Sequence, residues 1–276
     1  MVDAAGIAQH YGPEGLLDRL TAALSTMGRD AGPLRMEELA PLDQFHSRGL
    51  AATVELARAL SLDSSMRVLD IGSGLGGPSR YLAATYGCTV HGVDLSLPFV
   101  EAATFLAERT GLSGLVSYRR ADALHLPFDA GEFDVAWTQH VAMNIADRVA
   151  LYRETSRVLR AGGRFAIFDV VAASDTPLHF PVPWARGPEA SFLVTADRMR
   201  ALLVEQGFRP VSQIDTTQAA LTWFSEREKA RAQQTTPPAL GLHLAMGPGF
   251  AEMTANLARN LREGRAALVQ AIYEKS

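Results

Sequence analysis

The sequence predicts an α/β fold built on a mostly parallel sheet wrapped by helices. Short apolar runs alternate with helical patterns from Met66 onward, and the first run leads directly into a glycine-rich loop and a helix. We expect strands near 67–71, 89–94, 115–121, 133–138, 163–171 and 210–216. Because sheets of this kind bind ligands beyond the carboxyl ends of their strands, we expect the functional site at that edge.

Capping residues predict where the helices between these strands begin and end. Ser96 and Asp147 precede helical patterns, and their side-chain oxygens suit the N-cap position. Gly87, Gly111 and Gly207 fall where helices should stop, since glycine readily adopts the left-handed conformation that ends a helix.

Composition bounds the class of function. The chain has 276 residues, 47% of them hydrophobic, which supplies one generous core with room for insertions. A net charge of −4 without basic runs argues against a nucleic-acid partner, and the single Cys88 argues against disulfides or a cysteine zinc cluster. We see no membrane-spanning stretch and no signal peptide, so we expect a cytoplasmic protein without a membrane partner.

The glycine loop and a later aspartate predict a nucleotide-like cofactor. Glycines at 72, 74 and 77 let the backbone turn tightly and let a ligand approach closely. Asp94 ends the next apolar run about twenty residues on, where a carboxylate can accept hydrogen bonds from two ribose hydroxyls. The glycine spacing alone also fits an NAD-binding fold, so only the flanking segments can distinguish between the two kinds of cofactor site.

Those flanks carry a family resemblance. Asp70 lies two residues before the first glycine, and the chain continues with Ala-Asp-Ala-Leu at 121–124, Phe-Asp-Val-Ala at 133–136 and Val-Leu-Arg-Ala-Gly-Gly-Arg-Phe at 158–165. This ordered set resembles class I S-adenosylmethionine (SAM) methyltransferases over about residues 60–217. Within that superfamily it is similar to bacterial small-molecule enzymes of the sarcosine/dimethylglycine and tocopherol methyltransferase groups.

The resemblance implies the rest of the architecture. It implies a Rossmann-like class I methyltransferase sheet whose last strand, within 264–276, is antiparallel. Residues 1–59 are then an N-terminal helical lid, and 60–217 the SAM-binding core with an active-site insertion at 172–194. Residues 218–263 form a helical cap. Segments inserted after the fifth and sixth strands would roof the ligand edge and build the substrate site.

The resemblance also assigns cofactor-binding positions. Asp70 and the glycine loop would hold the methionyl part, Asp94 the ribose, Leu95 one face of the adenine, and Asp122 with the Ala123 amide the adenine edge. Asp70 as an internal strut and Asp122 as a simple turn former remain alternatives. The full predicted cofactor set is Asp70, Gly72, Ser73, Gly74, Asp94, Leu95, Asp122, Ala123 and Gln139.

Catalysis would depend mainly on positioning, because the methyl group of SAM is already activated. A general base is needed only if the acceptor arrives protonated, and the end of the fourth strand is the place to look. His140 is the favoured candidate there, and His46 on the lid is the second. Many relatives carry an acidic residue near His140 and a histidine near Asn144, so this chain departs from their pattern. No metal motif is present, and no metal is expected.

The predicted function is methyl transfer from SAM to nitrogen, oxygen or carbon of a small metabolite in a biosynthetic reaction. The insertions hold apolar side chains that suit such an acceptor or simply pack the cap: Phe180, Trp184, Phe192, Trp223, Phe224, Met246, Phe250 and Met253. A SAM-binding enzyme with a non-methylating reaction such as cyclisation is the main alternative. A nicotinamide oxidoreductase and a pure binding module are weaker ones, and the oligomeric state is open.

Overall fold

A seven-stranded sheet with the order β3-β2-β1-β4-β5-β7-β6 forms the centre of the molecule. The computed structural model describes residues 15–233, 239–247 and 249–276. Strands β1 to β5 run parallel, and β7 is antiparallel to both β5 and β6, which confirms the predicted fold class and final strand. The strands are β1 (Arg67–Ile71), β2 (Thr89–Asp94), β3 (Val116–Arg120), β4 (Phe133–Gln139), β5 (Leu159–Ala172), β6 (Phe208–Asp215) and β7 (Ala266–Lys275).

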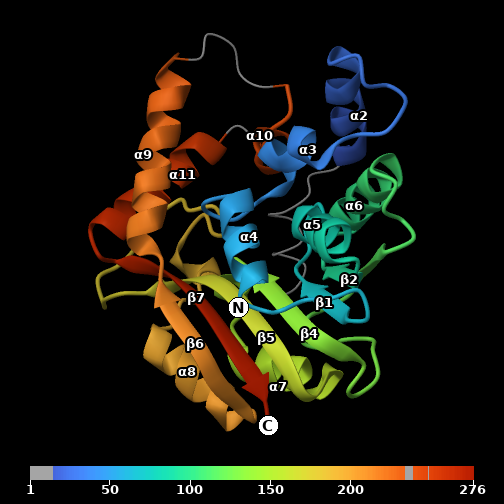
Figure 1. Cartoon of the computed structure of the whole chain (residues 1–276). Coiled ribbons are helices and arrows are strands. Elements are labelled where there is room, and N and C mark those ends of the chain that lie inside the picture. Colours follow the sequence, from blue (N-terminus) through green and yellow to red (C-terminus); the bar gives the residue numbers. More distant parts are fainter. Residues whose placement is uncertain (1–14, 234–238, 248) are drawn as a thin grey trace.

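Helices cover both faces of the sheet (Figure 1). Alternate strand residues point to opposite faces. Val68 therefore packs with residues of α4 (Leu50–Arg58), α5, α9 (Thr217–Gln233) and α11 (Phe250–Arg262), while Leu69 packs with residues of α7 and α8. The core helices are α5 (Gly77–Tyr86), α6 (Leu97–Arg109), α7 (Arg148–Val158) and α8 (Ala196–Glu205).

The predicted caps are confirmed. The Ser96 hydroxyl accepts a hydrogen bond from the Phe99 amide at 3.4 Å, and the Asp147 carboxylate accepts one from the Ala150 amide at 2.8 Å. Gly87, Gly111 and Gly207 adopt left-handed φ values of 73°, 71° and 84°, as expected of residues that end helices.

The N-terminal segment and the region between β6 and β7 together cover the carboxyl end of the sheet. Figure 1 shows α2, α3, α9, α10 and α11 at the end of the molecule opposite α7 and α8. Leucines of α2 and α3 share one buried cluster with α6, with Leu240 and Ala245 of the cap, and with Leu75 of the glycine loop. The lid helices are α2 (Leu16–Thr26), α3 (Met36–Asp43) and α4 (Leu50–Arg58), and the cap helices are α9 (Thr217–Gln233), α10 (His243–Met246) and α11 (Phe250–Arg262).

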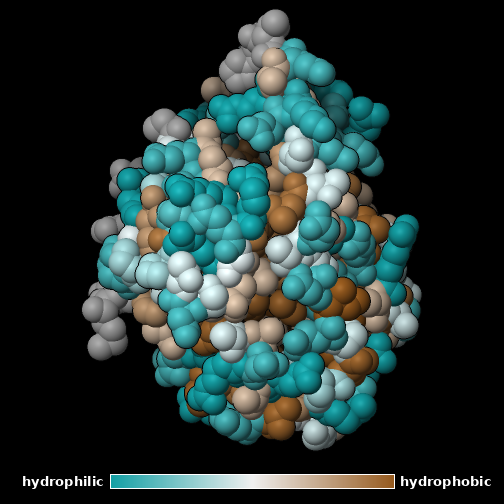
Figure 2. All heavy atoms as spheres, turned by 90° about the vertical axis from the view of Figure 1, so that its left-hand side faces the viewer, coloured by the Kyte–Doolittle hydropathy of each residue, from teal (hydrophilic) through white to brown (hydrophobic). Residues whose placement is uncertain are grey.

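Hydrophobic and hydrophilic residues are mixed on the surface. On the face turned to the viewer in Figure 2, hydrophobic residues occur in small groups among hydrophilic ones. Among the described residues, no helix combines the length and the apolar character needed to cross a membrane.

Candidate active site

The glycine loop turns sharply at the carboxyl end of β1. Gly72 and Gly74 adopt φ values of 73° and 53°, which side-chain-bearing residues rarely adopt. A Cβ atom at Gly72 would lie 2.5 Å from Cγ2 of Val141, so the loop passes close to the segment that follows β4. The amides of Gly72 and Ser73 donate to the Val93 carbonyl at 2.8 and 3.0 Å, which ties the loop to β2.

Asp94 ends β2 beside this loop. One carboxylate oxygen accepts a hydrogen bond from the Gly74 amide and the other from the Ser96 amide, both at 2.9 Å. Burial raises the pKa of the Asp94 carboxyl, while these amides and that of Leu95 oppose the shift. Asp94 is half-buried at the carboxyl end of β2.

Asp70 is held inside the molecule. Its carboxylate accepts a hydrogen bond from the Ser79 hydroxyl of α5 at 2.6 Å, and burial raises its pKa to about 7. This geometry matches the internal strut that the sequence left as an alternative. Ser73, by contrast, has a buried hydroxyl without a partner.

The segment after β3 lies next to Asp94. The Ala121 amide donates to the Asp94 carbonyl at 3.0 Å, which brings the 121–124 segment to the end of β2. Asp122 accepts from the Leu124 amide at 2.9 Å, and its side chain is 41% exposed. The structure thus brings Asp94, Leu95, Asp122 and Ala123 to one region, and their roles toward adenine stay predictions.

Gln139, the last residue of β4, has a fixed amide. Its oxygen accepts a hydrogen bond from the Trp137 indole at 3.0 Å and lies 3.2 Å from the Thr53 hydroxyl oxygen. Reversing the amide would place its NH2 group against the indole N–H, so the indole fixes the observed orientation. The NH2 group is buried and has no partner.

His140 follows in a left-handed conformation, with φ of 55°. Its ring lies 5.1 Å from the Phe168 ring and 6.2 Å from the His46 ring, measured between centroids. Nε2 is buried and has no hydrogen-bond partner, and burial holds the pKa of the imidazole well below its usual 6.5. The structure therefore presents a neutral histidine at the end of β4.

His46 has partners at both ring nitrogens. Nδ1 lies 3.2 Å from the Ser47 carbonyl, while Nε2 lies 3.0 Å from the Thr53 hydroxyl and 3.2 Å from the Gln44 side-chain oxygen. Because a carbonyl only accepts, Nδ1 carries the hydrogen when the ring is neutral. Burial lowers the pKa of His46 to about 4. The two predicted histidines thus lie together, and His46 is the one bound into the lid.

Several site residues were missed from the sequence. Thr53 and Gln44 connect His46 to Gln139, and no motif marks either of them. Asp169 of β5 accepts from the Ala142 amide at 3.0 Å and so anchors the turn after His140. Burial raises its pKa to about 6. A lone carboxylate inside the apolar run 165–173 was the signal that could have found it.

The remaining polar and aromatic side chains of the insertions lie elsewhere. His179 pairs with Glu263 at 2.7 Å, and His243 is exposed. Trp184, Phe224 and Met253 are buried packing residues, while the Trp223 ring stacks with the Arg227 guanidinium at 4.8 Å. In the described part of the chain, no cluster of histidine, cysteine and carboxylate side chains suits a metal ion.

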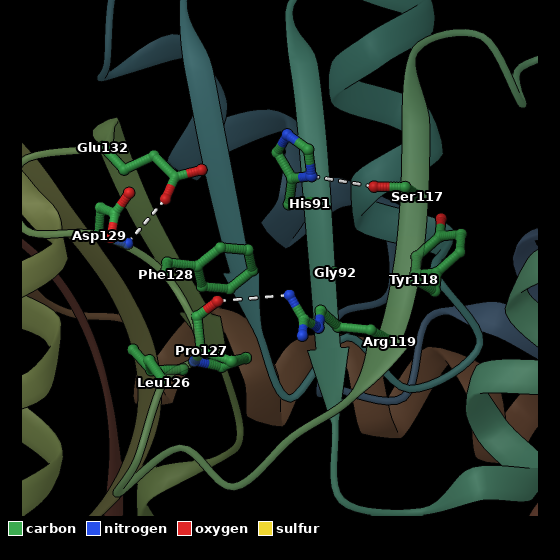
Figure 3. Close-up of a pocket in the computed structure, with 10 residues that line it drawn as sticks. All are labelled: His91, Gly92, Ser117, Tyr118, Arg119, Leu126, Pro127, Phe128, Asp129 and Glu132. Carbon is green, nitrogen blue, oxygen red and sulfur yellow. Dashed lines mark hydrogen bonds between the residues drawn. The ribbon is translucent and has the colours of Figure 1, made fainter.

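A hollow of about 620 Å³ lies along β2 and β3, before the point where Asp94 ends β2. Figure 3 shows His91 hydrogen-bonded to Ser117, and Arg119 donating a hydrogen bond to the Pro127 carbonyl, along this hollow. Its walls also include Phe128 and Glu132, and none of the predicted site residues lines it. The hollow is therefore separate from the ligand edge.

Comparison with known proteins identifies the family. The family described as "Methyltransferase domain" matches residues 69–167. The 27-O-demethylrifamycin SV methyltransferase of Amycolatopsis mediterranei is 33% identical over 66% of this chain and 67% of its own length. This chain belongs to the SAM-dependent methyltransferases. The predicted superfamily and its cofactor, SAM, are confirmed at the level of the family.

Other relatives match a smaller share of their length. A sarcosine/dimethylglycine N-methyltransferase of Halorhodospira halochloris is 33% identical over 64% of this chain and 63% of its own. The methyltransferase GfsG of Streptomyces halstedii is 38% identical over 47% of each chain. The alignments thus span about half to two thirds of these two relatives.

Solved structures agree on the fold of this methyltransferase. Geranyl diphosphate C-methyltransferase from Streptomyces coelicolor A3(2) superposes with a TM-score of 0.71 at 20% identity, covering 99% of this chain and 98% of that one. The [4+2]-cyclase SpnF superposes with a TM-score of 0.66 at 23% identity and covers 95% of each.

The site residues fit SAM. The glycine loop offers a close backbone approach, Asp94 ends β2 beside it, and the Ser73 hydroxyl is a buried polar group still without a partner. A molecule with a diol, a zwitterionic tail and a positively charged sulfur offers partners to such groups.

Proposed function

We propose that this chain transfers the methyl group of SAM to a nucleophilic atom of a small metabolite. The observation that carries the proposal is the meeting of the glycine loop, Asp94 and His140 at one edge of the sheet, under a lid and a cap. The family match supports it, because the matched residues 69–167 include the glycine loop, Asp94 and His140.

In this proposal, Asp94 holds the ribose hydroxyls, and Leu95, Asp122 and Ala123 border the adenine. The loop Gly72–Gly74 holds the methionyl part, and Asp70 supports this loop from inside the molecule through Ser79. SAM supplies an electrophilic methyl group, so the protein mainly excludes water and aligns the acceptor. His140 takes the acceptor's proton where there is one. His46 is held by Thr53 and Ser47, so in this proposal it positions the His140 ring and does not act as the base.

A non-methylating reaction such as cyclisation is the second candidate. The fold-level likeness to the [4+2]-cyclase SpnF favours keeping it, since the cofactor motifs would be the same in both cases. A cytoplasmic setting and a role in biosynthesis stay predictions.

The test is incubation of the purified chain with SAM labelled in its methyl group and a metabolite extract of the host, followed by mass analysis. We expect one metabolite to gain a labelled methyl group while SAM is consumed. Conversion of a metabolite without a gain in mass would support the cyclisation alternative. No change in any metabolite would contradict both.

A further inference from the structure

The unpartnered groups at the end of β4 restrict the kind of atom that is methylated. We infer that the acceptor is an oxygen nucleophile, a hydroxyl or enol, and that the Gln139 NH2 group binds that oxygen. The inference rests on the proposed function and narrows its substrate class.

The first step concerns what Gln139 can offer. Its amide oxygen accepts from the Trp137 indole, so the NH2 group, which has no partner, is a pure donor. Gln139 is 9% exposed, and a donor left unsatisfied at that burial is costly unless a ligand completes it. The ligand atom that Gln139 meets must therefore accept a hydrogen bond.

The second step compares the nucleophiles. A hydroxyl oxygen has two lone pairs, so it can accept from Gln139 with one and attack the methyl group with the other. An amine nitrogen has a single lone pair, and a hydrogen bond from Gln139 would occupy the pair that must react. A carbon nucleophile offers no comparable acceptor at the reacting atom. Of the three acceptor types left open by the sequence, oxygen fits this donor.

The third step concerns charge. An amine metabolite arrives mostly as an ammonium ion, which must lose a proton before the nitrogen can attack. The carboxylates that could take this proton have other roles in this account: Asp43 pairs with Arg80, Asp70 binds Ser79, Asp94 binds the glycine loop and is assigned to the ribose, and Asp169 holds the turn at Ala142. The side chains around His140 that the structure brings together are the neutral groups of His46, Phe168, Thr53 and Gln139. Arg48, whose positive charge contributes to the lowered pKa of His46, forms an ion pair with Glu55.

The reaction then balances within these groups. The acceptor O–H gives its proton to Nε2 of His140, in the tautomer that carries its own hydrogen on Nδ1. The oxygen's free electron pair forms the new bond to the methyl carbon, and the electron pair of the broken sulfur–carbon bond stays on sulfur. Gln139 donates to the oxygen throughout and so holds its remaining lone pair in place.

The first experiment identifies the methylated atom. The chain is incubated with SAM carrying a carbon-13 methyl group and the host extract, and the labelled product is isolated for NMR. The chemical shift of the methyl carbon distinguishes a bond to oxygen from bonds to nitrogen or carbon. We expect an O-methyl product. An N-methyl or C-methyl product would overturn the inference and leave the proposed function standing, whereas the absence of any methylated product would contradict the proposed function itself.

The second experiment tests Gln139 with the acceptor so identified. Gln139→Leu removes the donor and keeps the bulk, Gln139→Glu replaces the donor by an acceptor, and Gln218→Leu on the exposed face of α9 is the matched control. We expect both Gln139 variants to lose about tenfold or more in kcat/KM for the acceptor. Their affinity for S-adenosylhomocysteine, measured by calorimetry, should stay that of the parent chain, which also shows that they fold.

Two results would overturn the role of Gln139. One is unchanged kcat/KM in Gln139→Leu. The other is a loss of S-adenosylhomocysteine affinity as large as the loss of kcat/KM, which would assign the amide to the cofactor, as the sequence first suggested.

Discussion

Three buried polar atoms at the ligand edge, the Ser73 hydroxyl, the Gln139 NH2 group and Nε2 of His140, have no hydrogen-bond partner. Each unmade bond of this kind costs about 1–3 kcal/mol, so the protein gives up stability at these residues. Such costs are tolerated at sites that a ligand completes. The missing hydrogen bonds therefore indicate Ser73, Gln139 and His140 as residues that bind a ligand.

Asp94 can be tested by Asp94→Asn. We expect S-adenosylhomocysteine to bind about tenfold or more weakly, because a charge-assisted hydrogen bond is worth about 1.5–3 kcal/mol. Titration calorimetry measures this. Asp134→Asn is the control, since Asp134 is the second residue of β4, at the opposite edge, where it accepts from the Arg67 backbone amide and the Arg160 guanidinium. Equal affinity in Asp94→Asn and the parent chain would remove Asp94 from the ribose site.

His140→Ala should slow methyl transfer about 10²- to 10⁴-fold, the usual contribution of a general base, without weakening S-adenosylhomocysteine binding. The pKa of His140 lies well below 6.5, so the ring is already neutral at pH 6.5. The rate should therefore hold as the pH falls from 8 to 6.5 and decline only in more acid solution. Full activity in His140→Ala would exclude His140 from the mechanism.

His46 links stability to pH. Its folded pKa of about 4 lies below the ordinary 6.5, so the unfolded chain binds the proton more readily. The stabilisation is present above pH 6.5 and is lost as the pH falls toward 4, by up to about 3 kcal/mol. Urea unfolding of the parent chain and of His46→Gln at several pH values measures the difference, in which opposite effects of Asp70 and Asp169 cancel. A difference that does not change between pH 7 and 4.5 would show that His46 is not buried as a neutral ring.

At the scale of elements, most of the sheet could be predicted because period-two apolar runs and glycine turns are local signals. The predicted start of the fifth strand was wrong. The strand begins at Leu159 and not near 163, because residues 160–163 form an irregular stretch inside it, opposite Asp134 alone, where Gly162 adopts a φ of 70°. The last strand depended on the family resemblance, since residues 265–273 suit a helix equally well by composition.

The attachment of the lid to the core could not be predicted, because it depends on two residues far apart in the sequence. Asp43, at the end of α3, binds the Arg80 guanidinium of α5 at 2.7 Å, with both side chains buried. Arg80 also donates to the Leu75 carbonyl at 2.8 Å, which connects this ion pair to the glycine loop.

Removing one partner of this pair should be severe. We expect Asp43→Ala to lower the free energy of unfolding by about 3–5 kcal/mol, because it leaves the Arg80 charge buried and unpaired. The double variant Asp43→Ala/Arg80→Met should recover much of that loss. Urea unfolding of the two variants provides the measurement, and a single variant as stable as the parent would show that the lid is held by apolar contacts alone.

At the scale of the whole molecule, one buried cluster joins lid, cap, α6 and the glycine loop. Apolar periodicity predicts that each of these helices has a buried face, but it does not tell which faces contact each other. The packing of lid against cap is therefore known only from the structure. The consequence is that the glycine loop packs in one unit with the lid and the cap. A separate contact connects the lid to β4, where the Thr53 hydroxyl lies 3.2 Å from the Gln139 side-chain oxygen.

The central claim is that this edge of the sheet binds SAM and not a nicotinamide dinucleotide. Titration calorimetry of the purified chain with S-adenosylhomocysteine, and separately with NAD, tests it most directly. We predict saturable heat with S-adenosylhomocysteine, weakened in Asp94→Asn, and none with NAD. Saturable heat with NAD and none with S-adenosylhomocysteine would contradict the account.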